Sequence, residues 1–241
     1  MKQKISIIYE DNDILVVNKP AKLLTLPDRY RAHFPNLKAI FEKKYGKIFI
    51  LHRLDKETSG IIIFAKNKEA HRHLSLQFEN RTVVKKYRVL VNGRMEKDAD
   101  EIDKPIAPNL AKAGQMKIAK NGKQAITHYK VIERLNNFTY AEAEIKTGRT
   151  HQIRVHFMSI GHPLAIDAIY GKREAFFLSE IKRHKYKPNR KSRVENPLMD
   201  RVSLHSAALT IQHPVTQEIM TFEAELPKDF RAMLRQLKNN A

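Results

Sequence analysis

Nine mostly polar residues, His52–Gly60, stand between two short runs of branched and aromatic side chains, Ile48–Leu51 and Ile61–Ala65. Apolar runs of this length, bounded by polar residues and glycine, are typical of buried strands. The segment between them is therefore predicted to be a loop that the core holds at both ends. Arg53 and Asp55 are two residues apart, so in an extended segment their side chains lie on the same face. A carboxylate beside a cation on a rigid frame favours a functional site. The alternative is a turn whose aspartate caps a helix and whose arginine is solvated.

Net charge indicates the class of partner. The chain has 45 Lys and Arg against 26 Asp and Glu, a formal charge of +19, and its pI is near 10.0. An excess of this size favours binding to a polyphosphate such as nucleic acid over a generically basic protein.

Composition also excludes several classes of protein. There is no cysteine among the 241 residues, which excludes disulfides, thiolate nucleophiles and cysteine-based zinc sites. The N-terminus lacks the apolar segment of a signal peptide, and no apolar run approaches the roughly 18 residues of a membrane span. No repeat or long linker interrupts the chain. We therefore expect a soluble, cytoplasmic protein that folds as one continuous domain over residues 1–241.

Strands outnumber helices in the hydrophobic pattern. Between residues 92 and 125 the pattern is uninformative, and no regular alternation of strand and helix appears, which predicts an α+β fold with a largely antiparallel sheet. Leu37, Ile40 and Phe41 are expected to share one face of the first helix. The expected strands are 5–9, 14–17, 48–51, 61–65, 83–91, 127–131, 140–145, 204–212 and 219–225, and the expected helices are 36–45, one capped by Asn67, one from Thr150 to Gly161 and one from about Pro227.

A second polar stretch runs from Lys146 into the helix expected at Thr150. A strand that enters a helix through Thr-Gly-Arg-Thr leaves backbone N–H groups and Arg149 at a helix N-terminus, a possible anion site. An ordinary capped helix with a solvated arginine fits equally well. The three histidines that follow are spaced five and six residues apart and have no carboxylate among them, so no metal site is expected at His151, His156 and His162.

Residues 182–193 contain seven basic residues and no acidic one. Two interpretations stay open for this segment: a solvated, mobile run, or an arm that becomes ordered on RNA. Its basic residues are Lys182, Arg183, Lys185, Lys187, Arg190, Lys191 and Arg193.

Taken in order, the motifs of residues 5–226 resemble the RluA-type family of pseudouridine synthases, which isomerise uridine within RNA. The resemblance rests on Tyr9-Glu10-Asp11, Val17-Asn18-Lys19-Pro20, His52-Arg53-Leu54-Asp55, Thr58-Ser59-Gly60, Lys86-Tyr87, the run from Thr147 to His156, Gly161-His162-Pro163, Asp167, Tyr170-Gly171, Leu204-His205-Ser206 and His213-Pro214.

The resemblance implies a mixed, mostly antiparallel central sheet flanked by helices, with a catalytic cleft along its middle. It implies that Asp55 is the essential carboxylate, that Tyr87 lies against the target base and that Arg154 pairs with Asp55. Arg53 is expected to fill the place of a flipped nucleotide. The further residues expected to bind substrate are His52, Thr58, Arg149 and His151.

Three departures from the family pattern affect loops or domain content rather than these groups. Lys22 and Ala165-Ile166 replace more usual residues of two loops. The S4-like RNA-binding domain that many relatives carry before the catalytic domain is expected to be absent.

The implied reaction detaches uracil N1 from C1′ of the ribose and rejoins the base through C5 without redox change, so no cofactor and no metal are expected. Asp55 could attack as a nucleophile or remove a ribose proton as a general base, and the alternative interpretation of Tyr87 is a core tyrosine on a strand. The expected partner is a ribosomal or transfer RNA stem-loop, with no DNA and no membrane, and the oligomeric state stays open. The alternatives are a non-catalytic RNA-binding or ribosome-assembly protein on this fold, and an RNA hydrolase that uses His52 and His151.

Overall fold

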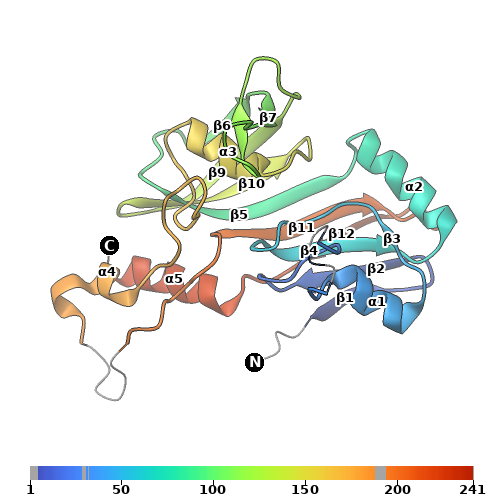
Figure 1. The fold of residues 1–241 in the computed structure, drawn as a ribbon, viewed down its shortest axis with the longest axis horizontal. Coiled ribbons are helices and arrows are strands. Elements are labelled where there is room, and N and C mark those ends of the chain that lie inside the picture. Colours follow the sequence, from blue (N-terminus) through green and yellow to red (C-terminus); the bar gives the residue numbers. More distant parts are fainter. Residues whose placement is uncertain (1–4, 29–30, 32, 188–193, 241) are drawn as a thin grey trace. The chain divides into compact units, whose positions relative to one another are not determined.

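The computed structural model describes residues 5–28, 31, 33–187 and 194–240 (Figure 1). The chain divides into two compact units. The first unit contains Met1–Tyr87, Glu144–Thr147 and His205–Glu225, and the second contains Arg88–Ala143, Gly148–Leu204 and Leu226–Ala241.

The first unit is built on strands that pair mostly in antiparallel fashion. Strand β2 (Ile14–Lys19) lies antiparallel to β1 (Ser6–Glu10) and to β4 (Ser59–Ala65), and the two-residue β3 (Phe49–Ile50) also pairs with β4. Strand β11 (Leu204–Gln212) runs parallel to β4, and β12 (Ile219–Glu223) runs antiparallel to β11. The mixed, mostly antiparallel sheet predicted for this chain is confirmed.

Two capped helices cover opposite faces of β4 in this unit (Figure 1). Helix α1 (Leu37–Tyr45) begins where the Asn36 side chain accepts the Ala39 N–H, and its Phe41 ring lies 5.9 Å from that of Phe64. Helix α2 (Lys68–Glu79) is capped in the same way by Asn67 and packs Ala70 and Leu74 against Ile61 and Ile63. Neighbouring strand residues point to opposite faces. Helix α1 therefore packs on the face of β4 that carries Phe64, and α2 packs on the face that carries Ile63.

The second unit contains more short strands than the sequence indicated. Strands β6 (Ala99–Asp103), β7 (Ile106–Pro108) and β8 (Met116–Ile118) lie in the stretch that showed no pattern. Strand β6 pairs antiparallel with β9 (Ile126–Leu135), and β10 (Phe138–Ile145) follows β9 after a turn at which Asn136 has φ +50°. Strand β5 (Val84–Asn92) and β10 each contribute residues to both units.

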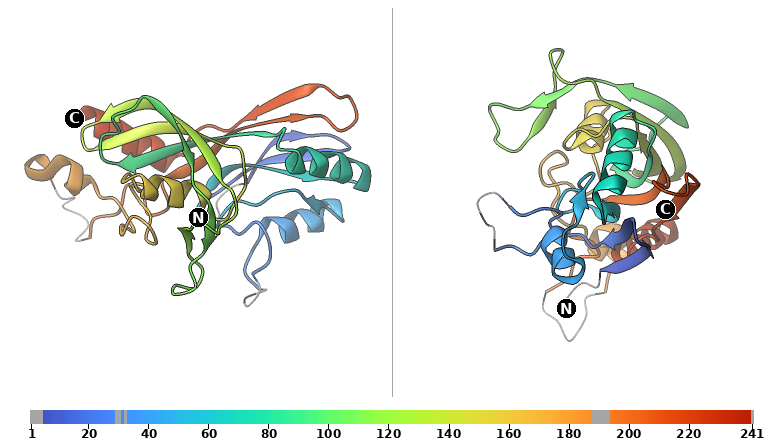
Figure 2. Two further views of the ribbon diagram at one scale, coloured as in Figure 1. Left: turned by 90° about the horizontal axis from the view of Figure 1, so that it is seen from above. Right: turned by 90° about the vertical axis from the view of Figure 1, so that its right-hand side faces the viewer.

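Helix α5 (Lys228–Asn239) supplies much of the core of the second unit. Its apolar residues Phe230, Met233, Leu234 and Leu237 are buried, as the sequence predicts, and Arg201 forms a two-point ion pair with Asp229 in its first turn. Helix α4 (Leu178–Lys182), followed by the short 3₁₀ helix η1 (Arg183–Lys185), lies next to α5 (Figures 1 and 2).

Two local predictions are corrected by the structure. Helix α3 (Gln152–Ser159) begins at Gln152 instead of Thr150, because His151 has a left-handed backbone with φ +55° that cannot continue a helix. Strand β4 begins at Ser59, so the loop between the apolar runs ends at Thr58.

Candidate active site

The loop that carries Asp55 is held to the first unit by two buried polar side chains. Lys19, at the end of β2, is fully buried, and its ammonium group donates to the carbonyl oxygens of Pro20, Leu23 and Lys56 at 3.0, 2.7 and 3.1 Å. The hydroxyl of Thr25 donates to the Leu54 carbonyl at 2.9 Å and accepts the Leu54 N–H at 3.2 Å. These contacts fix the backbone on both sides of Asp55.

Within this loop the predicted residues differ in exposure. Asp55 is half-buried, Arg53 is exposed and Thr58 is only 2% exposed. The Thr58 N–H donates to the Asp55 carbonyl at 3.1 Å, which closes a turn immediately after the carboxylate. The loop therefore presents Asp55 and Arg53 from a fixed backbone, while Thr58 contributes to the turn itself.

Strand β4 and strand β11 approach closely behind the loop. Gly60 is paired with Ser206, and a Cβ atom on Gly60 would lie 2.1 Å from the Ser206 carbonyl oxygen, which no side chain could tolerate. Beside it, the hydroxyl of Ser59 is 2.9 Å from Nδ1 of the buried His205. The glycine in the loop motif is therefore required by strand packing.

Tyr87, from β5, is the aromatic residue of this site. It is 6% exposed, and burial raises the pKa of its phenol to about 12, with a hydrogen bond to the Ser206 side chain opposing the shift and the negative charge of Asp55 adding to it. Tyr87 therefore stays protonated at neutral pH. Asp55, Tyr87 and Ser206 thus form one cluster within the first unit.

His52 has surroundings unlike those of an acid–base catalyst. Its ring stacks on Phe78 with centroids 5.0 Å apart, and its Nε2 accepts the Ile63 N–H at 3.2 Å. Burial, together with the charge of Lys85, lowers the pKa of the imidazole to about 3. A histidine that is neutral at pH 7 has no proton to give as a general acid, which argues against the hydrolase alternative that uses it.

Arg154, in the second unit, forms a buried ion pair with Asp167. Its Nε and Nη2 donate to the two carboxylate oxygens at 2.7 and 2.8 Å, and Asp167 also accepts the backbone N–H groups of Ile169 and Tyr170. The guanidinium carbon lies 5.0 Å from the centre of the Tyr170 ring. Sequence motifs contained Asp167 but did not indicate that it would hold Arg154, and the predicted pairing of Arg154 with Asp55 stays a prediction.

The remaining predicted residues of the second unit have local contacts. Arg149 donates its backbone N–H to the Gln152 side chain and its Nε to the Gln124 carbonyl, and Nδ1 of His151 is 2.9 Å from the Tyr170 hydroxyl. His156 and His162 each lie within hydrogen-bond distance of a backbone carbonyl. Of the basic segment, Lys182 closes α4 and Arg183 and Lys185 form η1, and Lys187 is also described. Arg190, Lys191 and Arg193 lie outside the described residues.

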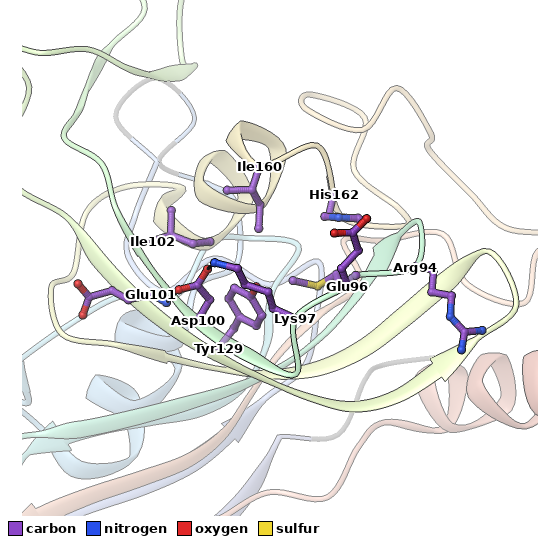
Figure 3. Close-up of a pocket in the computed structure, with 10 residues that line it drawn as sticks. Arg94, Glu96, Lys97, Asp100, Glu101, Ile102, Tyr129, Ile160 and His162 are labelled. Atoms are coloured by element: carbon purple, nitrogen blue, oxygen red, sulfur yellow. Dashed lines mark hydrogen bonds and ion pairs between the residues drawn. The ribbon is translucent and has the colours of Figure 1, made fainter.

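One open pocket of about 310 Å³ lies in the second unit, and none of the residues that line it was predicted to be catalytic (Figure 3). Lys97 and Asp100 form an ion pair of 2.6 Å within it, and the Tyr129 ring lies beside them. A further cluster in the first unit contains Asp11, Asp13 and His213. Because Nδ1 of His213 accepts two backbone N–H groups and its Nε2 donates to Asp11, hydrogen bonds already occupy both ring nitrogens.

Comparison with known proteins gives one family. A family model described as RNA pseudouridylate synthase matches residues 13–159. A Bacillus subtilis protein named as an uncharacterized RNA pseudouridine synthase is 37% identical over 98% of this chain and 74% of its own length. The ribosomal large subunit pseudouridine synthase D of Haemophilus ducreyi is 33% identical over 98% of this chain and 71% of its own length.

Solved structures agree in fold. Human RNA pseudouridylate synthase domain containing 1 has a TM-score of 0.69 at 27% identity, and the similarity covers 93% of this chain and 84% of that one. Among the described residues, none of the helices has the length and apolarity to cross a membrane. The resemblance seen in the motifs is confirmed: the chain belongs to the RNA pseudouridine synthase family, isomerases that convert uridine in RNA to pseudouridine.

Proposed function

We propose that Asp55 is the catalytic carboxylate of this isomerase and that Tyr87 lies against the uracil that it acts on. The observation that carries this proposal is the cluster of Asp55, Tyr87 and Ser206 within one unit, in which Asp55 stands on a loop whose backbone Lys19 and Thr25 hold in place. Rigid support of this kind is what a catalytic group needs.

The reaction breaks the bond between C1′ of the ribose and N1 of uracil, forms a bond from C1′ to C5, and transfers the C5 proton to N1. Asp55 can begin it as a nucleophile or by taking a ribose proton, and both routes use an ionised carboxylate. The neutral Tyr87 phenol offers a ring for stacking and a hydroxyl that its Ser206 partner orients. No cofactor or metal enters these steps, so we expect activity to persist in a chelator.

Access to a paired uridine requires the nucleotide to leave its stack, at a cost of a few kcal/mol. Arg53 is exposed on the same loop, two residues before Asp55, and its planar guanidinium can stack and meet phosphate. We propose that it takes the vacated place in the RNA. Replacing Arg53 with alanine should then lower the rate on a stem-loop much more than on an unpaired strand.

The decisive experiment replaces Asp55 with asparagine and uses Glu57→Gln, an acid of the same loop, as the matched control. We expect the Asp55 variant to form no pseudouridine while its RNA affinity is largely kept, and the Glu57 variant to stay active. Product from Asp55→Asn would reject the assignment of this carboxylate.

Ribosomal RNA of the large subunit is the proposed substrate, because several relatives carry that substrate in their names. Both units of residues 1–241 are proposed to act as one catalytic domain in the cytoplasm, with the basic segment from Lys182 onward adding contacts to the RNA. Pseudouridine maps of ribosomal and transfer RNA from cells with and without the gene test the substrate. Loss of a modification from transfer RNA alone would contradict it.

A further inference from the structure

Lys85 is a buried cation that the reaction outlined above does not use. Burial alternates along β5, so Lys85 and Tyr87 point to the same face of the strand. The Lys85 side chain is 7% exposed. Within residues 5–28, 31, 33–187 and 194–240, no hydrogen bond or ion pair holds its ammonium group, which lies 5.7 Å from the centre of the Phe78 ring.

The ammonium group at the end of this side chain keeps some exposure to solvent. Among the described residues, every fully buried side-chain nitrogen or oxygen has a hydrogen-bond partner, and the Lys85 ammonium has none, so it is not fully enclosed. The carbon chain of Lys85 is therefore buried while its charged end keeps some contact with solvent. A lysine arranged in this way can present its charge to an approaching anion.

The charges around Lys85 repel it more than they attract it. Burial lowers the pKa of its ammonium group, and the nearby positive charges of Arg81 and Lys146 lower it further. Glu144 provides the opposing attraction, but its carboxylate is already bonded to Lys146. The imidazole of His52, which also faces Lys85, is neutral. Three cations thus share one carboxylate.

This group of cations adjoins the catalytic loop inside the first unit. His52 is the first residue of the loop, its ring stacks on Phe78, and the Phe78 ring faces the Lys85 ammonium. Arg81 follows the end of α2 and is exposed, with a left-handed backbone at φ +59°. An anion bound here would lie one aromatic side chain away from the loop that carries Asp55.

We propose that Lys85, with Arg81 and Lys146, forms a phosphate subsite that binds the RNA backbone beside the nucleotide that reacts. The proposal rests on the proposed function, since it takes RNA as the ligand. A backbone phosphate would supply the negative charge that Lys85 lacks and would offset the repulsion among the three cations. Uridine at the reaction site would then be positioned by its phosphate as well as by its base.

The test measures the affinity of a synthetic uridine-containing RNA stem-loop at several KCl concentrations. All variants carry Asp55→Asn, so that no turnover disturbs binding. Lys85→Met and Arg81→Gln remove the proposed contacts, and Lys86→Met removes one charge from the opposite face of the same strand as the matched control. The free energy of unfolding of each variant is measured by urea denaturation.

Lys85→Met and Arg81→Gln should each make the slope of log affinity against log salt less steep by about 0.7–0.9, the contribution of one phosphate. The loss should be equal for stem-loops with and without uridine, because a phosphate contact does not read the base. Lys86→Met should keep the wild-type slope. Lys85→Met should also be at least as stable as its parent, since an unpaired buried charge is replaced by an apolar chain of similar length.

Unchanged slopes in both Lys85→Met and Arg81→Gln would overturn the proposal, and Arg81, being exposed, can be replaced without risk to the fold. A Lys85→Met protein that is less stable but keeps an unchanged slope would show that Lys85 stabilises the fold and does not bind phosphate. A different outcome is that the slopes stay unchanged while inorganic phosphate raises the Tm of the wild type and competes with RNA better than chloride at equal ionic strength. That outcome would assign the subsite to a free anion. Pseudouridine made by Asp55→Asn would refute the proposed function alone, because the salt slopes test this subsite without catalysis.

Discussion

Replacing Thr25 with valine should uncouple the Asp55 loop from the first unit. Valine has nearly the shape of threonine but lacks the hydroxyl that both donates to the Leu54 carbonyl and accepts the Leu54 N–H. Thr25 is 3% exposed and Leu54 is 5% exposed, so water does not readily replace the lost partner. A buried polar group left without its hydrogen bond costs about 1–3 kcal/mol, and two such groups give an expected loss of about 2–6 kcal/mol.

The loss should be seen in the rate as well as in stability. Leu54 precedes Asp55, so if the loop relaxes to hydrate its backbone, the carboxylate moves with it. A displacement of about 1 Å can reduce a rate by about 10²-fold. Urea denaturation measures the free energy of unfolding, and single-turnover conversion of RNA measures the rate.

Thr25→Ser is the matched control, because it keeps the hydroxyl and removes one methyl group. It should lose about 1 kcal/mol of stability and retain a rate near that of the wild type. A Thr25→Val protein with the wild-type rate and stability would refute the claim that this hydroxyl holds the loop.

Three further outcomes are expected. Gly60→Ala should lower the free energy of unfolding in urea by more than about 3 kcal/mol, because its Cβ would lie 2.1 Å from a carbonyl oxygen on a backbone with φ +113°. Gly148→Ala, whose Cβ would have nothing within 4 Å, should be tolerated. Equal effects of the two changes would contradict this. Asp167→Asn should cost about 3–5 kcal/mol by leaving Arg154 buried beside a neutral amide, and an Asp167→Asn protein as stable as the wild type would show that the pair contributes little. Because the pKa of His52 is near 3 in the fold and near 6.5 when unfolded, the unfolded state binds the extra proton below pH 6.5. Stability should therefore fall from pH 6.5 toward pH 3 by up to about 1.4 kcal/mol per pH unit, and His52→Gln should flatten that part of the profile; a parallel profile would contradict the neutral histidine.

Signals that act over a few residues were readable from the sequence. Asn36, Asn67 and Pro227 begin helices because capping depends on the side chain and the next turn alone. The strands β2 and β4 were readable because both are buried on both faces and are therefore continuously apolar. By contrast, β6 is exposed at four of its five residues and carries no alternation that could reveal it.

Contacts between distant segments were not readable. Ser206 meets Gly60 and Tyr87 because β11 pairs in parallel with β4, a strand far earlier in the chain, and no local pattern specifies that partner. The role of Asp167 beside Arg154 depends on the turn after α3 in the same way. Lys85 was hidden for another reason: a lysine in a strand is normally taken to be solvated, and only its burial shows otherwise.

The ammonium of Lys19 binds three carbonyl oxygens, and carbonyl oxygens are the same whatever side chain their residue bears. Positions 22 and 56, which are exposed around this clamp, can therefore change over evolution without disturbing the catalytic backbone. A contact of this kind, from one lysine to backbone carbonyl groups, would let related enzymes differ in the RNA that they bind through their exposed side chains while the catalytic backbone stays the same.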